Sequence, residues 1–207
     1  HYDATLVPRS WRMEHRTDCR IYQNESIRQV ISSVLSDHSV ENRFRCRGNQ
    51  DPPEREYCVQ YRESDWNYVS RLLEEEGFFY FFDHTEDAHT LVVSNDPQVH
   101  SEIPGESTVR FGSPEQSSSS RERIMNMSYA EQMVSGRVAQ QDYNFQMPTV
   151  DFGTDDEGEQ DTDLEVYDYP GVYDAPEKGT DLSQVRRERL EVLRRGGSGN
   201  SDCMRLL

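Results

Sequence analysis

The side chains best suited to binding a metal stand close together at His84, Glu86, Asp87 and His89. Imidazole and carboxylate groups are common zinc ligands, but this spacing matches no zinc pattern and the segment has the composition of a hairpin turn. Residues 151–163 carry the carboxylates of a calcium loop, yet no register places acids at alternate positions with glycine sixth and glutamate last. We therefore predict no metal site in either segment and interpret residues 151–163 as a mobile, solvated acidic loop.

Three consecutive glutamates, Glu74, Glu75 and Glu76, could supply an acid and a base for catalysis. Consecutive residues of a helix point in different directions, so these carboxylates are expected on a solvent-exposed face or at an interface. For nucleophilic catalysis, the sequence has no G-x-S-x-G motif, and Cys58 is accompanied only by scattered histidines. We predict that Cys58 lies in the core, that the chain has no catalytic residue and binds no cofactor, and that it is not an enzyme.

Residues 57–82, YCVQYRESDWNYVSRLLEEEGFFYFF, place a strand, a helix and a second strand in direct succession. Val59 and Tyr61 alternate with polar neighbours, which predicts a half-buried strand. The entrance of the helix could hold a salt-bridged cluster, or a contact between subunits, formed by Arg62, Glu63 and Asp65.

The helix in this segment has clear start and stop signals. Ser64 supplies a hydroxyl that can cap the free N–H groups, and Trp66, Val69 and Leu73 share one face. Gly77 lacks a Cβ and therefore favours the left-handed turn that ends many helices. We predict that the helix stops at Gly77 and that this glycine has a positive φ.

The aromatic residues 78–82 form an uninterrupted run. Such a run cannot alternate between interior and solvent, so we predict a strand with both faces covered by protein. A ligand pocket and a stacking platform for bases are the alternatives, and both are less consistent with this run and its acidic surroundings. The polar sequence DHTEDAH joins the aromatic strand to residues 90–94, which predicts a hairpin.

An earlier helix is indicated by an apolar stripe with Asn24 or Ser26 as its cap. The stripe consists of Ile27, Val30, Ile31, Val34 and Leu35. Phe44 and Cys46 then indicate a short strand that must end before Pro52-Pro53. Residues 1–95 are thus predicted to be an α+β module, preceded by the end of an earlier strand region.

Residues 96–123 are rich in proline, glycine, serine and charge, which indicates a long surface loop or a linker. Residues 124–207 are predicted to form a second, β-rich region. Two apolar runs separated by Ser135-Gly136 indicate a hairpin, with Ile124, Tyr129 and Met133 before the turn and Val138, Tyr143 and Phe145 after it.

The end of the chain is predicted to contain one more strand, LEVYDYP, and a helix over residues 181–195. Thr180 is the expected helix cap, and the expected stop is Gly196-Gly197. The apolar side of this helix would carry Leu182, Val185 and Leu193.

The chain has a net charge of -17 and 33% hydrophobic residues, which is a lean composition for an independent globule. Its acidic surface repels nucleic-acid phosphates and anionic lipids, so neither is an expected partner. No apolar run is long enough to span a membrane, and no signal peptide is recognisable. The cysteines Cys19, Cys46, Cys58 and Cys203 lack C-x-x-C spacing, and we expect reduced, mostly buried thiols.

The sequence resembles the Vgr (valine-glycine-repeat) family of bacterial type VI secretion and Rhs elements. The strings REYCVQYRESD and RLLEEEG carry this resemblance, and DCRIYQNESI, HTLVVSNDPQVH and YDYPGVY follow the family order. The structural motif positions are Asp18, Cys19, Arg20, Tyr57, Cys58, Tyr61, Arg62, Glu63, Asp65, Leu72, Glu75, Gly77, Tyr169, Pro170 and Gly171.

The resemblance implies an α+β fold of barrel-like, mostly antiparallel β domains with packed helices, similar to the phage tail baseplate hub. It implies a homotrimer that caps a hexameric tube, with effectors or a tip protein bound through parts absent here. Assembly in the bacterial cytoplasm is expected, followed by secretion or delivery into a target cell. His1 in place of methionine suggests a fragment. The alternatives are the hub of a prophage-type contractile particle and an effector enzyme with its activity outside this segment.

Overall fold

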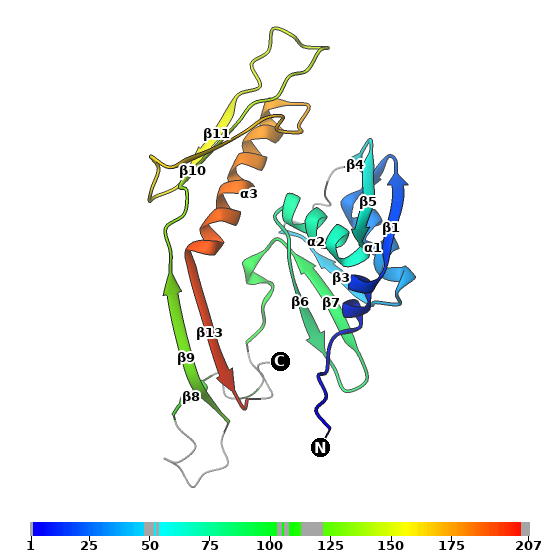
Figure 1. The fold of residues 1–207 in the computed structure, drawn as a ribbon, viewed down its shortest axis with the longest axis vertical. Coiled ribbons are helices and arrows are strands. Elements are labelled where there is room, and N and C mark those ends of the chain that lie inside the picture. Colours follow the sequence, from blue (N-terminus) through cyan, green and yellow to red (C-terminus); the bar gives the residue numbers. More distant parts are fainter. Residues whose placement is uncertain are drawn as a thin grey trace. The chain divides into compact units, whose positions relative to one another are not determined.

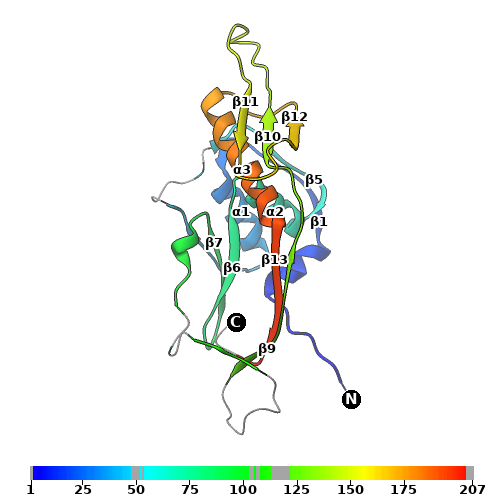
Figure 2. The same cartoon turned by 90° about the vertical axis from the view of Figure 1, so that its left-hand side faces the viewer.

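A computed structural model describes residues 2–47, 52, 54–102, 105, 108–112 and 122–203 (Figures 1 and 2). The chain divides into two compact units, His1–Ser101 and Glu102–Leu207, and each is described by itself. Pro53, the second residue of the double proline, lies outside the described residues. The serine-rich residues 113–120 of the expected loop or linker also lie outside them.

The first unit has α+β architecture, as predicted. Its elements are η1 (Arg9–His15), β1 (Thr17–Tyr22), β2 (Glu25–Ser26), α1 (Ile27–Asp37), β3 (Asn42–Arg45), β4 (Glu54–Arg55), β5 (Cys58–Ser64), α2 (Asp65–Glu75), β6 (Phe79–His84), β7 (His89–Ser94) and η3 (Pro97–Val99). Strand β7 is the centre of a sheet, parallel to β3 and antiparallel to β6, while β1 pairs with β5 and β2 pairs with β4.

Helix α1 begins where the cap signal predicted. The Ser26 hydroxyl accepts a hydrogen bond from the Gln29 backbone N–H, and the Gln29 side chain accepts one from the Ser26 N–H, which forms a capping box. The apolar stripe is confirmed, because all five of its members are buried: Ile27, Val30, Ile31, Val34 and Leu35.

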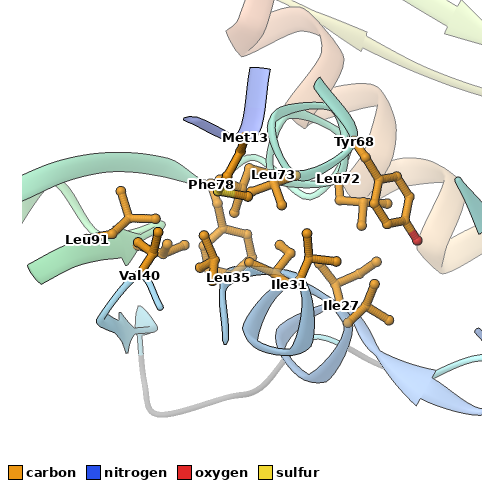
Figure 3. Packing of buried hydrophobic residues seen from close by; sticks show 14 of the residues in the cluster. Met13, Ile27, Ile31, Leu35, Val40, Tyr68, Leu72, Leu73, Phe78 and Leu91 are labelled. Carbon is orange, nitrogen blue, oxygen red and sulfur yellow. The ribbon is translucent and has the colours of Figure 1, made fainter. Parts of the chain in front are cut away.

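Helix α2 is also confirmed at both ends. Ser64 accepts a hydrogen bond from the Asn67 N–H, and Gly77 has a φ of 70°. The left-handed turn at Gly77 lets the Phe78 N–H reach the Leu73 carbonyl at 2.8 Å, so the chain turns directly from the helix toward β6. Figure 3 shows the core that results, with Ile31 and Leu35 of α1 facing α2.

The predicted buried face of β5 is wrong. Cys58 and Gln60 point into the protein, whereas Tyr61 is 65% exposed. The buried Gln60 amide nitrogen donates to the Asp65 carboxylate at 2.8 Å and to the Glu63 carbonyl at 3.1 Å, whereas the amide oxygen is buried without a partner among the described residues.

The predicted cover on both faces of the aromatic strand is also wrong for the residues that the structure describes. The hairpin of β6 and β7 forms as expected, but β6 lies at the edge of its sheet and Tyr80 is 40% exposed. The strand with both faces covered is the central β7, whose Leu91, Val92 and Val93 are buried.

The second unit contains β8 (Arg110–Phe111), β9 (Arg123–Glu131), β10 (Arg137–Gln140), β11 (Thr154–Glu157), β12 (Glu165–Asp168), α3 (Pro176–Arg194) and β13 (Arg195–Ser201). Strand β10 lies between β11 and β12 in one sheet, and β9 lies between β13 and β8 in another. The predicted hairpin around Ser135-Gly136 is therefore wrong, because β9 pairs with β13 instead of β10.

Two further predictions for the second unit need correction. Residues 151–163 are not only a loop, because β11 forms within them and pairs with β10. Helix α3 begins earlier than predicted, at Pro176, because Pro is well suited to the first helical turn. No side chain caps this helix, and Thr180, the expected cap, lies inside it. Gly196 and Gly197 do not end the helix but belong to β13.

The interior of the second unit mixes apolar side chains, such as Val138 and Phe152, with buried polar ones. Helix α3 buries Gly179, Ser183 and Arg194, whereas Leu193, predicted on its apolar side, is exposed. Ser183 donates to the Gly179 carbonyl at 2.9 Å and accepts from the Gln140 amide at 2.7 Å. This unit is thus held by hydrogen bonds as much as by apolar contact.

Candidate functional site

The entrance of α2 is prepared by an irregularity in the β1–β5 ladder. Asp18 is opposite Glu63 and Cys19 is opposite Tyr61, so Arg62 is an extra residue without a partner in the register. Its φ of 52° is unusual for a residue with a side chain. The bulge re-aims the chain toward α2.

Asp65, the first residue of α2, has a fully buried side chain with a complete set of partners. One Arg20 nitrogen (Nη2) lies 3.0 Å from both carboxylate oxygens, and His38 Nε2 lies 2.7 Å from Oδ2. The Gln60 amide donates at 2.8 Å, and Arg16 Nε lies 3.6 Å from Oδ2. A buried carboxylate is expensive to desolvate, and these hydrogen bonds offset that cost.

The network continues outward from Arg20 to two more carboxylates. Arg20 lies 2.9 Å from Asp18 and 3.1 Å from Asp37. Hydrogen bonds from Arg20 and from the Cys19 N–H hold the pKa of Asp18 below its ordinary value. Burial alone would lower the pKa of Arg20, but hydrogen bonds to Tyr22 and Asp18 and the charge of Asp65 raise it. We call Asp18, Arg20, His38, Gln60 and Asp65 the Asp65 network.

A second charged cluster joins the other end of α2 to β4 and β5. Arg71 lies 2.7 Å from Glu63 and 2.9 Å from Glu75, and Arg55 lies 2.7 Å from Glu75 and 2.6 Å from Glu76. Glu75 and Glu76 were considered as possible catalytic acids, but both are held in ion pairs with arginines of the same unit.

The groups considered for chemistry do not converge on a reaction centre in the described part of the chain. Cys58 lies in the core with its sulfur 3.2 Å from the Tyr68 hydroxyl, and burial raises the pKa of Tyr68. The rings of His84 and His89 are 6.2 Å apart, and the Arg9 backbone N–H donates to His89. Within the described ranges no three His, Cys, Asp or Glu side chains gather as a metal site would require.

The whole sequence, residues 1–207, matches the family described as phage tail baseplate hub (GPD). The chain belongs to the phage tail baseplate hub family.

Relatives of known description include spike proteins. The type VI secretion system spike protein VgrG1b of Pseudomonas aeruginosa is 32% identical over 194 residues, covering 92% of this chain and 26% of that protein. The actin cross-linking toxin VgrG1 of Vibrio cholerae is 32% identical over 199 residues, covering 94% of this chain and 18% of that protein. The chain therefore spans about a quarter of the spike relative and less of the toxin.

Solved structures share the fold. An E. coli component of the type VI secretion system, described as similar to the T4 bacteriophage tail proteins gp27 and gp5, aligns over 95% of this chain and 40% of its own with a TM-score of 0.59 and 16% identity. A prophage MuSo2 tail protein from Shewanella oneidensis aligns over 86% of this chain and 50% of its own with a TM-score of 0.56 and 10% identity. These likenesses confirm the α+β, hub-like fold.

Three of the predicted motif positions, Asp18, Arg20 and Asp65, meet in the Asp65 network. Asp18 and Arg20 of β1 contact Asp65 or its partners, whereas Arg62 points elsewhere, 5.2 Å above the Tyr61 ring. The salt-bridged cluster predicted from Arg62, Glu63 and Asp65 is therefore wrong in its members, because Arg20 pairs with Asp65 where Arg62 was expected. Glu63 belongs to the Arg71 cluster instead.

Several motif positions are at the surface of the first unit. Cys19, Tyr57 and Tyr61 are exposed, which corrects the expectation of a buried thiol for Cys19. All four cysteines are free, and only Cys58 and Cys203 are buried.

Sequence reasoning missed His38 and Gln60, two of the partners of Asp65. His38 follows α1 and lies far from Asp65 in sequence, and no local pattern links the two. A polar residue at an inward position of a strand, as at Gln60, could have signalled a buried partner.

The last predicted motif positions, Tyr169, Pro170 and Gly171, lie beside α3. Arg186 lies 3.1 Å from the Gly171 carbonyl and 3.1 Å from Asp168. A Cβ at Gly171 would collide with the Tyr173 ring, so this turn requires glycine.

Across the described residues no helix combines the length and apolar character needed to cross a membrane.

Proposed function

We propose that this chain is a structural segment of a type VI secretion spike protein, in which three copies form a hub that caps a hexameric tube. Sheath contraction then drives the spike through a target membrane and delivers effectors. The proposed role is mechanical, with assembly in the bacterial cytoplasm before delivery.

The observation that carries this proposal is an uncovered apolar ribbon in the second unit. Met125, Met127 and Tyr129 of β9 are exposed on one face of the β9–β13 pair. Gly199 and Gly197 stand opposite Met127 and Tyr129, so β13 contributes no side chain that could cover them. We call β9 and β13 together the ribbon.

The ribbon is also open at its edge. Strand β13 pairs only with β9 among the described residues, and all of its residues are exposed. Strand β8 pairs with β9 only at Arg123 and Ile124, so most of the ribbon is two strands wide, and a two-stranded ribbon is marginally stable alone. An edge strand without Pro or Lys is open to further pairing. Copies of the same chain are the simplest partners, and a closed ring of three needs one surface to meet a different one on the next copy.

An enzymatic role has less support. The carboxylates of Asp65 and Glu63 are ion-paired within the first unit, and this chain covers only 18% of the toxin relative's length. We propose that any catalytic activity of the whole protein lies outside this segment. A prophage-type tail hub is the nearest structural alternative, and flanking genes for phage heads would favour it.

Sedimentation of the full-length protein, alone and with the purified tube protein, tests the proposed hub. We expect a trimer at low concentration that binds the hexameric tube ring. A stable monomer or dimer across physiological salt would contradict the proposal.

A further inference from the structure

Two loops of the second unit lie side by side and expose apolar side chains. The first follows β10 and the second follows β12, and the Gly171 N–H donates to the Gln141 carbonyl at 3.0 Å. Figure 2 shows the segment between β10 and β11 extending beyond the end of its sheet. Exposed apolar side chains on these loops include Tyr143, Phe145, Tyr169 and Val172, and we call these four the loop patch.

Val172 is held in a conformation that its side chain disfavours. Its φ is 65°, and a β-branched residue at positive φ is a strained outlier. Asp142 maintains this conformation, because its carboxylate accepts hydrogen bonds from the Val172 N–H at 2.6 Å and the Tyr173 N–H at 3.2 Å. Burial does not offset this strain, because Val172 is 78% exposed. Such strain is often found where a side chain is positioned for function.

The surroundings of the loop patch are strongly acidic. Residues 138–177 contain 12 Asp and Glu residues and no Lys, Arg or His. Ion pairs with cations outside this segment engage only some of these acids: Asp155, Asp156, Asp161, Glu165, Asp168 and Asp174. The segment keeps an excess of negative charge around its exposed aromatic side chains.

This charge selects the class of partner. A second copy of the chain carries a net charge of -17 as a whole, so its overall charge opposes docking on this acidic region. We propose that the loop patch docks a different protein, whose surface carries Lys and Arg around an apolar socket. We take this partner to be the tube ring, and that choice rests on the proposed hub function. The ribbon is left for contacts between copies of the chain.

The test uses the full-length protein and the purified tube ring, with affinity measured at low and high ionic strength. Phe145→Ala removes an exposed aromatic side chain, and Val172→Gly removes the valine at a φ that glycine adopts easily. We expect each variant to weaken ring binding about tenfold, in the range of an interface anchor. Wild-type affinity should fall with salt. Val192→Ala, on an exposed position of α3, is the matched control and should leave binding unchanged.

Sedimentation of the same variants separates the outcomes. Trimers that form normally but bind the ring weakly support the loop patch as the docking site. Unchanged ring binding by both variants, or binding that does not depend on salt, overturns it. Loss of the trimer in both variants also overturns it, by assigning the patch to contacts between copies. If wild-type trimers do not bind the ring, both the assignment of the patch to the tube and the proposed function are wrong. If the wild-type protein forms no trimer, the proposed hub is wrong.

Discussion

Helices α1 and α3 each bury one face, but they bury different chemistry. Helix α1 buries five aliphatic side chains against the rest of the first unit, and α3 buries a glycine, a serine and an arginine. Apolar burial stabilises a unit without outside help, whereas hydrogen bonds contribute little net free energy because the unfolded chain also bonds to water. We therefore expect the first unit to fold by itself and the second to depend more on partners.

The largest expected loss of stability in the first unit comes from removing Asp65, the centre of the Asp65 network. Asp65→Ala leaves Arg20, His38 and Gln60 without their shared acceptor and should cost about 3–5 kcal/mol in free energy of unfolding. Urea denaturation measures this loss. Asp37→Ala is the control, because Asp37 contacts the same arginine at the surface and should cost under about 1 kcal/mol. Equal losses in the two variants would contradict the central position of Asp65.

The comparison of the two helices can be tested with one truncation in each. Ile31→Ala in α1 removes buried aliphatic volume and should cost about 2–5 kcal/mol. Ser183→Ala in α3 leaves the buried Gln140 amide with a lost partner and should cost about 1–3 kcal/mol. Thermal unfolding of both variants gives the two values. A neutral Ser183→Ala would mean that hydrogen bonds do not hold α3 in place.

The smallest expected effect concerns backbone conformation. Gly77→Val forces a β-branched residue to a φ of 70° and should cost on the order of 1 kcal/mol or more. Gly196→Ala is the control in the second unit, because an added Cβ there meets no atom within 4 Å. A melting temperature unchanged by Gly77→Val would count against the left-handed turn.

Local signals predicted the first unit better than the second. Ser26, Ser64 and Gly77 act on their immediate neighbours, so α1, α2 and the hairpin after Gly77 could be predicted from nearby residues. The pairing of β9 with β13 joins residues about 70 positions apart, such as Ser128 and Ser198, and no local pattern records it.

The candidate site divides in the same way. The cluster at the entrance of α2 was expected at Asp65, but its arginine comes from β1 and its histidine from the end of α1. Long-range partners of this kind depend on the assembled fold. The edge position of β6 likewise follows from the sheet order, which the aromatic run does not determine.

Hydrogen exchange measured over a dilution series of the full-length protein shows whether other copies complete the second unit. We expect strong protection of amides in α1 and α2 at every concentration, because their core is internal. We expect β13 amides to gain protection only as the oligomer forms. Equal protection of β13 in the dilute monomer, or exposed β13 amides in a stable trimer, would show that other copies do not complete the second unit.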